Sequence, residues 1–252
     1  MGYENKFASV DGMKTRYFEA GGGPPITELP KTMRAFRART LALIADLDDR
    51  QMIGPCLSIV NPPLWELGHV AWFQEFWVLR HLRKRRALLE NGDRLYNSTD
   101  VAHDSRWELL LPTRSKTLRY MENVLDTCIE LIEKSHELSQ EEVYFYLLAM
   151  FHEGMHAEAL AYTRQTLGYA APLLPEHKAA ILDTAGPCSG DVEIPGGTFL
   201  IGATADYPFV FDNEKWAHEV EIKPFHIARA PVTNGEYLAF VEDGGYHQER
   251  FW

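Results

Sequence analysis

The stretch Phe151–Leu160 reads FHEGMHAEAL and carries two histidines inside a long helical pattern. His152 and His156 are four residues apart, so on a helix both side chains project from one face, within reach of a single metal ion. Glu153 and Glu158 flank the pair. Alternatively, the histidines are ordinary helix residues, since a short motif of this kind also occurs by chance. A third ligand from another segment would favour the metal site.

The composition predicts a globular, cytoplasmic protein. The chain has 252 residues, of which 46% are hydrophobic, which is enough for a substantial core. Its formal net charge of -11 argues against nucleic acid and membrane surfaces as partners, because both attract basic proteins. Cys56, Cys128 and Cys188 are widely spaced, which is typical of a reducing compartment. We expect neither a membrane span nor a signal peptide, because no apolar run is long enough.

Residues 1–26 differ in pattern from the rest of the chain and are expected to form an appended hairpin or a flexible leader. The segment KFASVDGMKTRYFEAGGGPP, from Lys6 to Pro25, has a strand pattern, an Asp-Gly turn and a second strand pattern, followed by a Gly/Pro-rich break.

Four amphipathic helices are expected within residues 27–185, and together they predict a four-helix bundle. The helical patterns cover about 30–48, 63–82, 115–135 and 140–167. Metal sites in such bundles are built from side chains that project inward from facing helices. His69 of the second helix could therefore join His152 and His156 as the third ligand. The alternative for His69 is a core histidine whose ring is satisfied by a carbonyl.

A second, β-rich domain is expected over residues 192–252. Prolines and glycines after Gly168 mark a linker, and the segments VEIPGGTFLIGA and HEVEIKPFHIA then alternate as strands do. A domain of about 60 residues is at the low end for independent folding, so we expect this one to be incomplete.

Five blocks of sequence point to one family. They are NPPLWELGHVAWFQEFW at Asn61–Trp77, LYNSTDVAHDSRW at Leu95–Trp107, FHEGMHAEAL at Phe151–Leu160, IPGGTFLIG at Ile194–Gly202 and FDNEKWAHEVEIKPFHIARAPVTNGEYLAFVEDGGY at Phe211–Tyr246. In this order the chain resembles the nonheme-iron sulfoxide synthases of ergothioneine biosynthesis and their sister selenoneine synthases. The resemblance implies an α+β fold, in which a DinB-like four-helix bundle precedes a C-type-lectin-like domain similar to that of formylglycine-generating enzymes.

The resemblance also implies a chemistry. In that family His69, His152 and His156 would hold Fe(2+), and the iron would activate O2 to join the imidazole C2 of hercynine to sulfur or selenium. Three neutral histidines suit such a reaction, because they leave open positions for O2 and for a thiolate or selenolate. Imidazoles also bind zinc, nickel and copper, so the iron rests on the resemblance.

Two departures from the family bear on the substrates. Met155 stands where the sulfoxide synthases usually carry a glutamine that contacts the substrate imidazole. The segment RWELLLPTR lacks the arginine-rich pattern that binds γ-glutamylcysteine, which leaves Arg106 and Arg114 as candidates. We therefore take Met155 and Arg106 as substrate-binding candidates and favour a selenoneine synthase-like reaction. The alternative is a sulfoxide synthase that uses cysteine or γ-glutamylcysteine. We assign no catalytic residue, because the family's catalytic tyrosine lies later in the second domain than residue 252.

Other interpretations remain open. HEGMH matches the HExxH motif of zinc metalloproteases, with Glu153 as general base and Glu176 as a possible third ligand. A DinB-type metal-dependent thiol transferase would use a similar bundle without redox chemistry, although the second domain argues against it. A non-catalytic bundle would use the histidines for packing alone. Glu153 is expected to be a solvated helix residue, although an acceptor role toward the histidines is also open.

Overall fold

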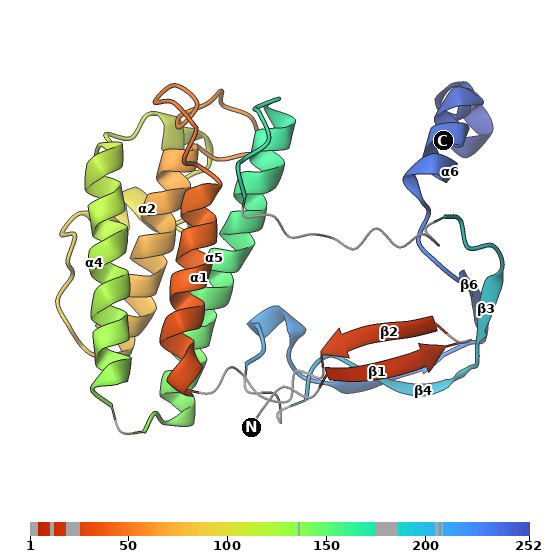
Figure 1. Ribbon diagram of the computed structural model, residues 1–252, viewed down its shortest axis with the longest axis horizontal. Helices are drawn as coiled ribbons and strands as arrows, with labels where there is room; N and C mark the ends of the chain where they lie inside the picture. The colour runs from red at the N-terminus through yellow and green to blue at the C-terminus, as the bar shows by residue number, and fades with distance from the viewer. Residues whose placement is uncertain are drawn as a thin grey trace. The chain divides into compact units, whose positions relative to one another are not determined.

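The computed structural model describes residues 5–10, 13–18, 26–135, 137–174, 186–204, 207 and 209–252. It divides the chain into two compact units. The first comprises Met1–Pro175 and Ala205–Asn213, and the second comprises Glu176–Thr204 and Glu214–Trp252. The first unit is largely helical and the second contains short antiparallel strands, so the chain is mixed α+β, as predicted (Figure 1).

The helical unit contains four long helices, which are α1 (Leu29–Ala42), α2 (Pro63–Gln74), α4 (Arg114–Glu133) and α5 (Gln140–Thr166). Its shorter elements are η1 (Ile26–Glu28), the π-helix η2 (Glu75–Leu82), α3 (Gly92–Tyr96) and η3 (Asp104–Trp107). Figure 1 shows the long helices side by side, and α1 and α2 each contact both α4 and α5. None of the helices in the described ranges has the length and apolar content needed to cross a bilayer.

Three of the long helices begin where their sequence supplies a start signal. α2 starts at Pro63, where a missing N–H costs nothing. The Thr113 side chain accepts a hydrogen bond from the Lys116 N–H at the start of α4. Ser139 and Glu142 form a reciprocal capping box at the start of α5. These local signals explain why the helix starts could be predicted closely.

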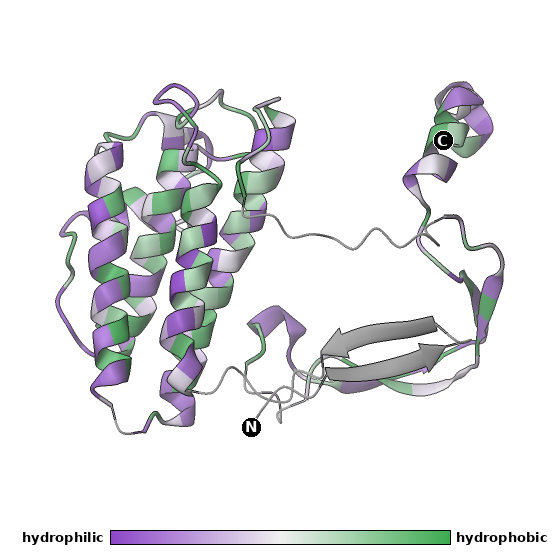
Figure 2. Ribbon diagram, viewed as in Figure 1, coloured by the Kyte–Doolittle hydropathy of each residue, from purple (hydrophilic) through white to green (hydrophobic). Residues whose placement is uncertain are grey.

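α2 is buried on every side. Each residue from Pro63 to Trp72 is buried. α4 instead buries one stripe, and Figure 2 shows apolar and polar positions alternating along α1 and α4. A helix that is enclosed all round carries its few polar side chains into the core. Glu66 and His69 of α2 therefore need partners inside the protein.

A segment distant in sequence packs on α5 within the same unit. Phe209 stacks against Phe151 with ring centroids 5.0 Å apart and lies 5.3 Å from the ring of Tyr144. Phe211 meets Phe151 edge-on at 6.5 Å. This aromatic cluster adjoins the turn of α5 that carries His152.

Two short strands precede the helices. β1 (Asn5–Val10) pairs antiparallel with β2 (Met13–Phe18), in a register that runs from Asn5 opposite Phe18 to Val10 opposite Met13. The Asp11-Gly12 turn expected between them lies outside the described residues.

In the second unit, β3 (Asp191–Ile194) pairs with β6 (Phe225–Ala228), and β4 (Gly197–Ile201) pairs with β5 (His218–Ile222), both antiparallel. α6 (Asn234–Glu242) follows, and the 3-10 turns are η4 (Asp212–Glu214), η5 (Gly245–His247) and η6 (Glu249–Phe251). All five residues of β4 are exposed. Gly245 is the only buried residue among those described in this unit. The core of the described structure therefore lies in the helical unit.

Candidate metal centre

The structure brings His69 of α2 together with His152 and His156 of α5. One ring nitrogen from each residue lies within 4.8 Å of the others, and Nε2 of His69 is 3.3 Å from Nε2 of His152. Two nitrogens bound at about 2.1 Å to one ion lie about 3.0 Å apart in octahedral and about 3.4 Å apart in tetrahedral geometry. The observed separation suits two ligands of one ion.

His69 is held by a backbone carbonyl at the end of a short helix. Its Nδ1–H donates to the Tyr96 carbonyl at 2.7 Å, and this carbonyl is free because α3 ends there. A Cβ on Gly68 would lie 2.1 Å from the Tyr96 ring, so only glycine permits this approach. With Nδ1 protonated, the neutral ring presents its Nε2 lone pair to the cluster. Burial, with a smaller contribution from the nearby His156, lowers the pKa of His69 to about 3.

His152 lies between an aromatic ring and the other histidines. Its ring stacks on Phe73 at a centroid distance of 3.6 Å and an interplanar angle of 9°. Burial, together with the neighbouring histidines, holds the pKa of His152 well below its ordinary value. Its Nδ1 has no hydrogen-bond partner among the residues that the structure describes. The ring is therefore neutral at physiological pH and only partly satisfied by the protein.

His156 faces a carboxylate. Its Nδ1 lies 3.7 Å from Oε2 of Glu66, a residue that is only 1% exposed. Neither atom has a hydrogen-bond partner elsewhere in the described parts of the chain. Buried polar atoms are normally paired, so unpaired atoms at one place indicate a missing partner.

The donor set fits a divalent transition-metal ion. His69 offers a lone pair on Nε2, and two further imidazoles lie within ligand distance of it. Imidazole nitrogen suits iron, zinc, copper and nickel, and three such ligands leave other coordination positions open. A site of this kind can bind an exogenous molecule next to the ion, which a fully protein-ligated site cannot do.

Of the residues predicted to contact substrate, Met155 is exposed to solvent, whereas Arg106 and Arg114 bind other protein groups. Met155 is 52% exposed on α5, one residue before His156. The Arg106 guanidinium donates to Asn61 Oδ1 at 2.6 Å and lies 4.0 Å above the Trp65 ring. Arg114 donates to main-chain carbonyls in the segment that follows α1, at 2.8 Å to that of Ile44 and at 2.5 Å to that of Leu47. Both arginines are therefore engaged within the protein.

The structure corrects the prediction that Glu153 is a solvated helix residue. Its side chain is buried, and its two oxygens accept from Arg37 at 2.7 and 3.2 Å. Glu158, by contrast, is exposed. With both oxygens bound to Arg37, Glu153 is not available as the general base of an HExxH protease. Glu176, the third ligand in that interpretation, lies outside the described residues.

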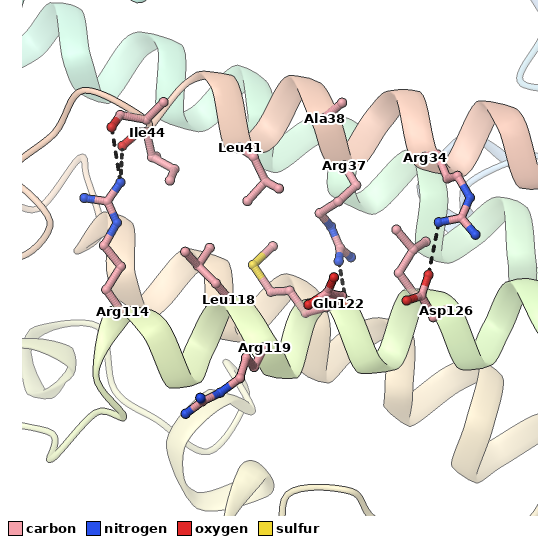
Figure 3. Close-up of a pocket in the computed structure, with 13 residues that line it drawn as sticks. Arg34, Arg37, Ala38, Leu41, Ile44, Arg114, Leu118, Arg119, Glu122 and Asp126 are labelled. Atoms are coloured by element: carbon pink, nitrogen blue, oxygen red, sulfur yellow. Dashed lines mark hydrogen bonds and ion pairs between the residues drawn. The ribbon is translucent and has the colours of Figure 1, made fainter.

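A groove of the helical unit lies apart from the histidines. A cavity of about 590 Å³ lies between α1 and α4, and none of the three histidines lines it. Figure 3 shows an ion pair of Arg34 with Asp126 at one end and, at the other, hydrogen bonds from Arg114 to the chain just after α1, at Ile44. Both charged ends are thus occupied by protein groups, and we assign the groove no part in the chemistry.

Three residues at the cluster were not singled out from the sequence, or were given another role. Glu66 precedes His69 by three positions on one helix, a spacing that places two side chains on the same face and could have identified it. Phe73 packs against the cluster of Trp65 and Trp72 and also stacks on His152. Tyr96 contributes only its backbone carbonyl, which no side-chain pattern reveals.

Fold and cluster together define an α+β protein whose helical unit carries a candidate metal centre. The model of the DinB superfamily matches residues 32–160, and that of the sulfatase-modifying factor enzyme 1-like domain matches residues 178–252. Because the first match covers about half of the chain, this chain belongs to the DinB superfamily.

Curated relatives cover both units. A hercynine oxygenase of Mycolicibacterium thermoresistibile is 32% identical over 232 residues, which make up 91% of this chain and 51% of the relative. A hercynine oxygenase of Mycolicibacterium smegmatis is 32% identical over 219 residues, or 86% of this chain and 50% of the relative. A formylglycine-generating enzyme of Streptomyces coelicolor is 39% identical over 64 residues, or 25% of this chain and 20% of that enzyme. The chain spans about half the length of the hercynine oxygenases it matches.

Proposed function

We propose that this protein is an iron- and O2-dependent oxidoreductase that acts on hercynine, with Fe(2+) held by His69, His152 and His156. The observation that carries the proposal is the convergence of His69, His152 and His156, each with one ring nitrogen within 4.8 Å of the other two. Similarity to hercynine oxygenases over most of this chain supports the choice of substrate.

The chain's own residues would prepare the site. Tyr96 keeps the Nε2 lone pair of His69 directed at the cluster. The rings of Trp65 and Phe73 stack on His69 and His152 and exclude water from that side. Iron, when bound there, supplies the one-electron chemistry that activation of O2 requires. The three neutral ligands leave coordination positions for O2 and for the second substrate.

A finer proposal concerns the products and the domains. We propose formation of a C–Se or C–S bond at the imidazole C2 of hercynine, and we favour the selenoneine branch because Met155 replaces the family's usual glutamine. Residues 27–185 would form a DinB-like four-helix bundle, and residues 192–252 would begin a lectin-like domain of the formylglycine-generating enzyme type. Met155 and Arg106 remain the substrate-binding candidates, and we expect the protein to work in the cytoplasm.

The test starts with the purified protein under anaerobic conditions. Fe(2+) is added back after chelation, the bound metal is quantified, and O2 uptake is then measured with hercynine and either cysteine or a selenosugar. The variant His69→Ala is expected to lose the metal as completely as His156→Ala. The matched control is His81→Ala, because His81 is exposed on η2 beside Trp77 and takes no part in the cluster.

The outcomes separate the interpretations. O2 uptake that requires iron, hercynine and all three histidines would support the proposal, and the more effective donor would identify the branch. Stoichiometric zinc with no response to hercynine would favour a DinB-type thiol transferase. Full metal occupancy in His69→Ala would rule out the three-histidine site.

A further inference from the structure

Glu66 is buried beside the histidines with half of its hydrogen-bonding capacity unused. It lies on α2, three residues before His69, and is 1% exposed. One carboxylate oxygen, Oε1, accepts from Asn61 Nδ2 at 2.9 Å. The other, Oε2, is 3.7 Å from His156 Nδ1, slightly beyond hydrogen-bond distance. A buried carboxylate with an oxygen aimed at an unpaired ring nitrogen needs an explanation.

A chain of contacts fixes the direction in which Glu66 points. Arg106 donates to Asn61 Oδ1 at 2.6 Å, so the Asn61 amide must turn its NH2 group toward Glu66. The Arg106 guanidinium in turn lies 4.0 Å from the centre of the Trp65 ring. Trp65 stacks on His69 with centroids 4.8 Å apart. The same network therefore contacts two of the three histidines.

Glu66 faces the Nδ1 atom of His156. If Nδ1 carries the proton, Nε2 has the lone pair and is free for an ion, which is also the tautomer that Tyr96 imposes on His69. Metal-bound histidines generally donate their second N–H to a carboxylate or carbonyl, which fixes the tautomer and the ring orientation. Tyr96 serves His69 in this way, and Glu66 is the group placed to serve His156.

We propose that Glu66 is the positioning residue of His156: it accepts the Nδ1–H and holds Nε2 toward the ion, and the pair of Asn61 and Arg106 keeps its carboxylate in place. The inference rests on the proposed three-histidine metal site. It assigns to Glu66 the acceptor role that the sequence analysis left open for Glu153.

The first test compares two buried glutamates. Glu75, on η2, is also only 1% exposed, but it accepts from Tyr120 and from the Leu88 N–H instead of facing a histidine. Co(2+) and Zn(2+) dissociation constants are measured by chelator competition for the wild type, Glu66→Gln and Glu75→Gln. Glu66→Gln is expected to raise the dissociation constants of both ions by about 10- to 100-fold and to alter the visible spectrum of bound Co(2+). Glu75→Gln is expected to leave affinity and spectrum unchanged.

The expected loss has a specific cause that a second variant can reverse. In Glu66→Gln, Asn61 still donates to the amide oxygen, so the amide NH2 faces His156 Nδ1 and favours the wrong tautomer. Adding Asn61→Asp lets residue 61 accept from that NH2 group while still pairing with Arg106, which turns the amide oxygen toward His156. The double variant should regain most of the affinity, and a purely structural role of Glu66 would not produce this rescue.

The two proposals fail in distinguishable ways. If the wild type binds no ion, or if His69→Ala binds the ion as tightly as the wild type does, the proposed three-histidine metal site is overturned. If the wild type binds through its histidines and Glu66→Gln matches it in affinity and Co(2+) spectrum, the role of Glu66 alone is overturned. Loss in Glu66→Gln without recovery in the double variant would also overturn it, provided that circular dichroism shows all variants folded.

Discussion

Two buried polar clusters lie side by side along α5, and they differ in how fully their hydrogen-bonding groups are used. In the first, all three guanidinium nitrogens of Arg37 donate, to Glu153, to the Met121 carbonyl at 2.5 Å and to Gln74 at 3.1 Å. In the second, formed by the three histidines and Glu66, ring nitrogens and a carboxylate oxygen have no partner among the described residues.

The difference distinguishes a structural residue, Glu153, from a candidate ligand, His152, at adjacent positions of α5. A fully satisfied buried network holds elements together, and breaking it leaves an uncompensated charge. A buried cluster with unpaired atoms is costly unless something outside the chain completes it. Glu153 therefore ties α5 to α1, whereas His152 next to it is available for a ligand. Substitutions, metal binding and pH can each test this contrast.

The largest effect is expected from the satisfied cluster. Glu153→Ala leaves the Arg37 charge buried without its partner, which should lower the free energy of unfolding by about 3–5 kcal/mol. Urea denaturation followed by circular dichroism measures the change. The matched control is Glu158→Ala on the same helix, where the side chain is exposed and the expected change is within about 0.5 kcal/mol. Equal stability of the two variants would show that the Arg37 cluster is not what joins α1 to α5.

The second prediction concerns the unsatisfied cluster and its ligand. An ion that completes the histidine cluster binds the folded state, so at 100 times its dissociation constant it should raise the free energy of unfolding by about 2.7 kcal/mol. The gain should disappear on chelation and be absent in His156→Ala. Stabilisation of His156→Ala by the same amount would place the ion elsewhere in the protein.

The helices and the histidine cluster could be predicted because their signals are local. The capping box of Ser139 and Glu142 and the spacing of His152 and His156 each lie within a few residues of one helix. Only the participation of His69 could not be predicted from local sequence, because it lies on another helix. The expectation that helices of a bundle direct side chains into a common core supplied it. α6 was not predicted, although its own capping box of Thr233 and Glu236 is also local.

What could not be predicted depends on contacts between distant positions. Arg37 and Glu153 are 116 positions apart, and neither residue carries a local sign of its partner. Glu153 was therefore taken as solvated, in keeping with the usual exposure of glutamate. The pairing of β3 with β6 likewise joins strands that are distant in the sequence, because β4 and β5 lie between them in the chain. Alternation of apolar residues predicts a strand but does not identify its neighbour.

The third prediction uses the pKa of His69, which burial lowers from 6.5 to about 3 in the folded, metal-free protein. As the pH falls below 6.5, the unfolded chain takes up a proton that the folded protein does not. The free energy of unfolding should therefore decrease as the pH falls from 6.5 toward 3, by at most about 1.4 kcal/mol per pH unit for this group. Urea denaturation at pH 7, 6 and 5 in the presence of a chelator measures the slope.

The control for this pH effect is His69→Gln. Arginine partners lower the pKa of carboxylates such as Asp46 and Asp93. Protonation of these carboxylates at low pH lowers the free energy of unfolding of the wild type and of His69→Gln by the same amount. Subtracting the two slopes isolates the histidine. Identical slopes would mean that His69 gains a proton in the folded state as readily as in the unfolded chain.

The smallest effect should have the opposite sign to the first. His152→Leu removes a partly buried ring whose buried Nδ1 has no partner in the described structure, and it keeps an apolar side chain against Phe73. We expect the metal-free protein to gain roughly 1 kcal/mol of stability, because the cost of burying the unpaired nitrogen is removed. Metal binding should be lost, because the imidazole ligand is removed as well. Urea denaturation with chelator, followed by metal titration, measures both. If His152→Leu instead destabilises the metal-free protein as strongly as Glu153→Ala, the histidines hold the helices together in the same way as Arg37 does, and the contrast between the two clusters fails.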